Sequence, residues 1–236
     1  SGLEHLYAWM LPGSTPFSRF GGDRLLQLAI LACMLTAAVL MLVAAALYPG
    51  GSIADSQSPG FIWSKNFISN LFQEKALNGA TNPGRVWALA GIAFQSLGDG
   101  LFFLRMSRVI AERHAALVLK VTGIVNIAFN FMIATPFHDA MVVLSSSLSL
   151  LGLFYITVFI LRTKLHLLKV CCIACMVVFY YTLFLYGTGN VGLLAIMQKV
   201  ALLCSTLLVL GLAFFTKAEH FVPRAGIPAG KMPLKA

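Results

Sequence analysis

The chain has 236 residues, of which 59% are hydrophobic and 11% are charged, and its formal net charge is +9. About a quarter of the residues in a typical soluble domain are charged, so this composition excludes an ordinary soluble protein and indicates a membrane protein. The basic residues are dispersed between apolar segments, which argues against a nucleic-acid partner and favours contact with the anionic lipids of a cytoplasmic membrane face.

Six apolar segments are each long enough to cross the bilayer as a helix, which takes about 20 residues. In chain order they span residues 25–48, 86–104, 115–137, 140–161, 167–186 and 191–216. Segments of this kind must be helical in lipid, because the hydrocarbon offers no partner to free backbone amides. The predicted fold is therefore all-α, a polytopic transmembrane bundle of six helices over residues 25–216. An N-terminal segment (1–24) precedes the bundle and a C-terminal tail (217–236) follows it.

The longest loop, residues 49–85, joins the first two predicted helices and contains a stretch with helical periodicity. One side of such a helix carries Trp63, Phe67, Ile68, Leu71 and Phe72, and the other carries Asn66, Ser69, Asn70 and Gln73. This pattern predicts a short amphipathic helix at the outer surface. It would either pack against the ends of the bundle helices or form a lid over a pocket.

Basic residues collect in alternate connections. Twelve of the seventeen Lys and Arg residues lie on one side, namely Arg19, Arg24, Arg105, Arg108, Arg113, Arg162, Lys164, Lys169, Lys217, Arg224, Lys231 and Lys235. The other side has Lys65, Lys75 and Arg85, all in the long loop. The positive-inside rule therefore predicts that both termini are cytoplasmic.

Three charged residues lie within predicted spans: Asp99, Lys120 and Lys199. Such residues are costly in a bilayer and usually pair with one another or face a cavity. Asp99 and Lys120 each lie six residues from the cytoplasmic end of consecutive helices, so we expect them to form an intramembrane ion pair. The pair would have a structural role or belong to a proton or ion relay; alternatively, Lys120 extends alone to the interface.

Lys199 lies deeper, about nine residues below the predicted outer turn, roughly 13 Å. Polar residues at a comparable depth are Gln95, Asn130, Ser145, Ser146, Ser147, Ser149 and Gln198, with His138 and Asp139 above them at the boundary. If these faces converge, they form an outer polar cavity for a lipid headgroup or a small anionic ligand. The alternative is that the Ser and Asn side chains join helices by hydrogen bonds.

Recognised catalytic and metal-binding patterns are lacking in the sequence. A metal hydrolase needs about three converging His, Cys or carboxylate ligands, and we expect neither a metal nor a cofactor. A hydrolase built from Ser145, His138 and Asp139 can be drawn, but a His and an Asp adjacent in sequence make its geometry awkward. Enzymatic activity is therefore not expected.

Four short motifs occur near helix ends: Tyr48-Pro49-Gly50, Asn66-Phe67-Ile68-Ser69-Asn70-Leu71, Pro136-Phe137-His138-Asp139 and Gln198-Lys199. Together they resemble the DUF998 group of six-helix membrane proteins and, more remotely, the Frag1/DRAM-like group. The family pattern has an acidic residue where Asn70 stands and Arg where Lys199 stands. The resemblance implies the six-helix fold over residues 25–216 and a bacterial inner membrane, and it implies no common activity.

These observations favour a non-enzymatic integral membrane protein that binds a lipid or small ligand or serves as an accessory subunit of a membrane complex. Its expected partners are membrane lipids and other membrane protein subunits. One alternative is a secondary transporter or relay that uses Asp99, Lys120 and Lys199. The other is a lipid-modifying hydrolase around His138 and Asp139.

Overall fold

The structure of the chain, a computed structural model, describes residues 21–132, 135 and 137–221, apart from the side chains of residues 21, 130, 138, 139, 142 and 143. Within these residues there is no strand, and the predicted all-helical class is confirmed. The long helices are α2 (Gly21–Ala46), α3 (Arg85–Val109), α4 (Arg113–Met132), α5 (His138–Leu161), α6 (His166–Thr188) and α7 (Val191–Phe215). Most of both predicted terminal segments lies outside the described residues.

Five of these helices, α2, α3, α5, α6 and α7, are long and apolar enough to cross a membrane. Their outward surfaces are also apolar, since large side chains such as Leu25, Leu203 and Phe215 are mostly exposed. Lipid is the solvent that such a surface fits, because water would favour polar residues there. The chain is therefore a helical integral membrane protein.

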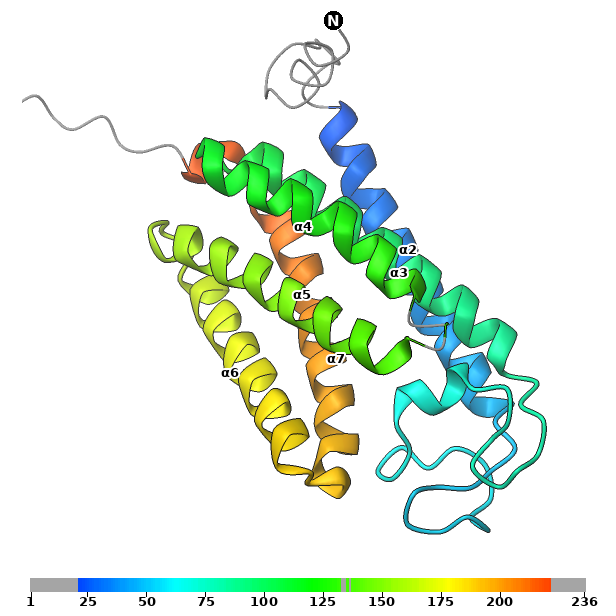
Figure 1. Cartoon of the computed structure of the whole chain (residues 1–236). Helices are drawn as coiled ribbons and strands as arrows, with labels where there is room; N and C mark the ends of the chain where they lie inside the picture. Colours follow the sequence, from blue (N-terminus) through cyan, green and yellow to red (C-terminus); the bar gives the residue numbers. More distant parts are fainter. Residues whose placement is uncertain (1–20, 133–134, 136, 222–236) are drawn as a thin grey trace, which may run out of the picture.

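The helices form one bundle in which each packs against the next in sequence (Figure 1). The last helix, α7, also contacts α2 and α3, which closes the arrangement. Small residues bring helices close together: a Cβ atom on Gly100 of α3 would lie 2.2 Å from Ile127 Cδ1 of α4. Close packing of this kind supports helix association in lipid, where hydrophobic burial supplies little driving force.

Residues 49–84, named the cap here, connect α2 to α3 at one end of the bundle (Figure 1). The structure has a short helix within the predicted stretch, but it is the five-residue 3-10 helix η1 (Ile68–Phe72) rather than a longer helix with one polar face. Ile68, Leu71 and Phe72 are buried as expected, but Asn66 and Asn70 are buried as well rather than facing water. The cap packs against the helix ends, in agreement with one of the two interpretations of the loop.

Asparagine side chains add to the backbone hydrogen bonds inside the cap, which include isolated bridges between Gly50 and Pro59 and between Lys75 and Thr81. Asn66 donates from Nδ2 to the Gly51 carbonyl (2.7 Å) and accepts at Oδ1 from the Ile62 amide (2.9 Å). Asn82 donates to the carbonyls of Leu71 and Gln73 and accepts from the Gly84 amide. These bonds satisfy backbone groups that would be costly to bury alone.

Tight backbone contacts fix the start of the cap. Gly51 has a φ of 85°, in the left-handed region that favours glycine, and a Cβ atom there would lie 2.3 Å from the Asn78 amide nitrogen. The Tyr48 hydroxyl accepts a hydrogen bond from the Leu77 amide (3.0 Å). The cap is therefore a folded unit rather than a loose connection.

Candidate functional site

Lys199 and Gln198 of α7 hold the cap onto the bundle. The Lys199 ammonium donates to the backbone carbonyls of Asn66 and Ala195 and lies 5.9 Å from the centre of the Phe61 ring. The Gln198 Oε1 accepts a hydrogen bond from the Ile68 amide (2.8 Å). A charge in this position is stabilised by carbonyl dipoles and by the aromatic face, and no acidic residue of the described part of the chain pairs with it. Both side chains therefore bind protein backbone.

Gln95 and Asp99 form a second polar group, on the side of α3 that faces α2. The Gln95 Nε2 donates to Asp99 Oδ2 (3.3 Å) and also contacts the sulfur of Met34 (3.2 Å) on α2. Ion pairs join Arg105 to Asp23 and Lys217 to Glu219. The predicted pair between Asp99 and Lys120 is not among them.

The relative register of α3 and α4 explains this correction. Gly100 of α3 meets Gly123 of α4, since a Cβ atom on Gly123 would lie 3.1 Å from the Gly100 carbonyl oxygen. Asp99 is thus level with about Ile124, and Lys120 lies one turn farther along α4, or about 6 Å. Asp99 also meets Gln95, which contacts Met34 of α2. The sequence prediction ended the second span at residue 104, whereas α3 continues to Val109, so depths counted from its end were displaced.

Serine and asparagine side chains form a third group between α4 and α5. Ser145 donates to Asn126 Oδ1 (2.7 Å), and Asn126 Nδ2 donates to Ser149 Oγ (2.8 Å). Ser146 is half-buried beside them on α5. These contacts match the alternative interpretation, in which polar side chains join helices. Asn126 was missed by the sequence analysis, which weighed only Asn130.

The predicted outer cavity is therefore divided among separate contacts in the described structure: Lys199 and Gln198 meet the cap, Gln95 meets Asp99, and the serines meet Asn126. The side chains of Asn130, His138 and Asp139 lie outside the described part. The cavity mouth and the hydrolase arrangement that depend on these three residues stay predictions.

A buried arginine, missed as a site by the sequence analysis, ties three helices together at the end of the bundle away from the cap. Arg105 of α3 is 0% exposed and makes two hydrogen bonds of 2.9 Å to the two carboxylate oxygens of Asp23 on α2. Its guanidinium also donates to the hydroxyl (3.2 Å) and the carbonyl (2.8 Å) of Thr216, which caps α7. This planar fork matches a carboxylate in geometry and charge.

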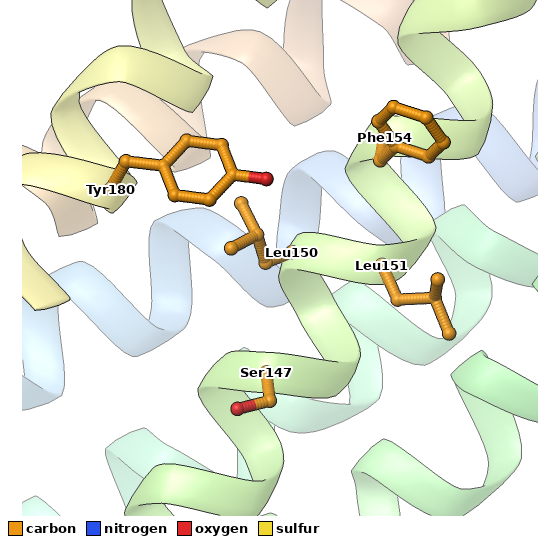
Figure 2. Close-up of a pocket in the computed structure, with 5 residues that line it drawn as sticks. All are labelled: Ser147, Leu150, Leu151, Phe154 and Tyr180. Atoms are coloured by element: carbon orange, nitrogen blue, oxygen red, sulfur yellow. The ribbon is translucent and has the colours of Figure 1, made fainter.

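A groove lies between α5 and α6 in the middle of their spans, with a volume of about 340 Å³. Its lining residues are Ser147, Leu150, Leu151, Phe154 and Tyr180. Figure 2 shows Tyr180 of α6 pointing toward Leu150, with Ser147, Leu151 and Phe154 on the same helix α5. Its lining is mainly hydrocarbon with two hydroxyl groups and no charge, so it fits an aliphatic chain better than an anion.

Comparison with models of known families, with curated proteins and with solved structures found no match. The resemblance to the DUF998 group therefore stays a prediction.

Proposed function

We propose that the chain is a non-enzymatic membrane protein with six passes and cytoplasmic termini, and that it binds membrane lipid in the groove between α5 and α6. Besides the five spanning helices, α4 supplies 20 helical residues that pack between α3 and α5 and support a sixth pass. An even number of passes returns the chain to the face on which it began. The excess of Lys and Arg on that face supports its assignment to the cytoplasm.

The groove is the observation that carries the lipid proposal. It lies among side chains that face the membrane, since Leu151, Phe154 and Tyr180 are 44%, 48% and 54% exposed. At this depth the molecules next to the protein are lipid acyl chains. A concave surface between two helices holds such a chain by van der Waals contact on both sides, whereas a convex helix surface touches it on one.

Filling the groove tests this proposal. Leu151→Trp places a large ring in the groove, and Leu203→Trp makes the same change on α7, where Leu203 is 62% exposed to the surroundings. Native mass spectrometry of protein released from lipid nanodiscs counts the lipids that each variant retains. We expect the wild type and Leu203→Trp to retain lipid equally and Leu151→Trp to retain at least one lipid fewer. Equal retention by all three proteins would exclude the groove as a lipid site.

A further inference from the structure

An acyl chain gains little selectivity from the groove alone. Lipid tails are as apolar as leucine side chains, so moving a tail from the bilayer into the groove involves no hydrophobic gain. Polar side chains near the interface can discriminate among lipids, because headgroups differ in net charge and in the hydrogen bonds that they can make. The reasoning rests on the lipid function proposed above.

Two basic residues lie on the same helical stripes as the groove. Arg162 follows Leu151 by eleven residues, and Lys169 precedes Tyr180 by eleven residues. Eleven residues are three helical turns to within about 20°, so each basic residue lies directly along its helix from a residue of the groove. Both stand at the end of the bundle that holds the turn between α5 and α6 (Figure 1).

The distance along each helix from the basic residue to the groove matches the thickness of one leaflet of the hydrocarbon core. Eleven residues of helix rise about 16 Å, and half of the hydrocarbon core measures about 15 Å. A lipid whose headgroup lies beside Arg162 and Lys169 would thus bring the end of its acyl chain to the depth of the groove. By the proposed orientation, this lipid belongs to the cytoplasmic leaflet.

The segment that contains the turn between α5 and α6 carries basic residues and no acidic ones. No Asp or Glu occurs between residues 140 and 218 of the sequence. Arg162 is exposed, its guanidinium lies 5.3 Å from the centre of the Phe159 ring, and neither it nor half-buried Lys169 forms an ion pair with a described residue. The Thr163 hydroxyl fixes the turn by donating to the Ile160 carbonyl (2.7 Å) and accepting from the Leu165 amide (3.2 Å).

We propose that Arg162 and Lys169 bind the headgroup phosphate of an anionic phospholipid whose acyl chain lies in the groove between α5 and α6. The guanidinium and the ammonium supply the positive charge, and the groove supplies shape. An anionic headgroup is favoured over a zwitterionic one because its net charge is not offset by an ammonium group of its own. The same two helices thus form both parts of one lipid site.

The test compares phosphatidylglycerol with phosphatidylcholine carrying identical acyl chains, mixed equally in nanodiscs, and uses native mass spectrometry to count each lipid retained. The variant Arg162→Gln/Lys169→Gln removes both charges from the stripes. The control Arg108→Gln/Arg113→Gln removes two exposed charges from the same end of the bundle, on α3 and α4. We expect the wild type and the control to enrich phosphatidylglycerol. In the test variant, the ratio of retained phosphatidylglycerol to phosphatidylcholine should fall about fivefold for each charge removed.

The outcomes separate this inference from the function on which it depends. Equal retention of the two lipids by the wild type, or unchanged enrichment in Arg162→Gln/Lys169→Gln, would overturn the headgroup site and leave the groove standing. If Leu151→Trp retains as much lipid as the wild type, the groove itself fails, whichever headgroup is retained. Loss of enrichment in the control as well would show that the general basic charge of this face attracts anionic lipid, which would also overturn the headgroup site.

Discussion

At the scale of single residues, Arg105 illustrates how a charge can lie inside a membrane protein at low cost. Its guanidinium binds both Asp23 and Thr216, which lie 82 and 111 positions away in the sequence. A basic residue at the end of an apolar segment ordinarily lies at the lipid headgroups, which is why the sequence predicts that the second span ends at residue 104, whereas α3 continues to Val109. Pairing across such separations cannot be inferred from one sequence, because nothing local distinguishes a buried arginine from an exposed one.

Replacing Arg105 should destabilise the bundle. Arg105→Leu leaves the Asp23 carboxylate and the Thr216 carbonyl without their donor, and because the Asp23 side chain is 42% exposed we expect a cost of about 2 kcal/mol, that of a lost hydrogen bond to a charged group. Arg108→Leu, at an exposed position one turn later on α3, should change stability by less than about 0.5 kcal/mol. Thermal unfolding in mild detergent, followed by circular dichroism, compares the two. Similar midpoints for both variants would show that the Arg105 contacts contribute little.

At the scale of elements, the cap shows where periodicity misleads. The alternation of apolar and asparagine residues between 61 and 73 resembles a helix with one wet face, yet Asn66 and Asn70 are buried and bind cap backbone. A hydropathy pattern identifies a polar side chain but not the partner that it meets. The place of Gln198 and Lys199 in the first half of the last long helix was predictable from the sequence, whereas their contact with the cap was not.

The cap should loosen when Lys199 is replaced. Lys199→Met removes the donor to the Asn66 and Ala195 carbonyls, and the buried Asn66 carbonyl then lacks this partner. Hydrogen–deuterium exchange should rise at least tenfold for amides of residues 61–72, with the middle of α7 unchanged. Lys65→Met, which removes an exposed lysine of the cap itself, serves as the control and should exchange as the wild type does. Unchanged exchange in Lys199→Met would mean that other contacts hold the cap.

At the scale of the whole molecule, composition and segment length were sufficient to predict a helical membrane protein, because lipid requires every backbone amide in a long apolar segment to be paired. The approximate bounds of the helices followed from the same rule. The contacts between helices did not, since the register of α3 against α4 depends on where Gly100 and Gly123 meet. The groove was not predictable either, because it depends on how α5 packs against α6. Ser147 was expected in a polar cavity, and it lines an apolar groove instead.

The proposed topology of six passes underlies the assignment of the lipid site to the cytoplasmic leaflet. Fusing green fluorescent protein to each terminus in turn, in bacterial cells, tests it directly, because the fusion fluoresces in the cytoplasm and not after export in an unfolded form. Labelling of Lys65→Cys in the cap by a maleimide that cannot cross membranes gives the position of the opposite face. We expect fluorescence from both fusions and labelling of the cap from outside intact cells. Fluorescence from only one fusion, or a cap that is labelled only after the cells are opened, would contradict the topology.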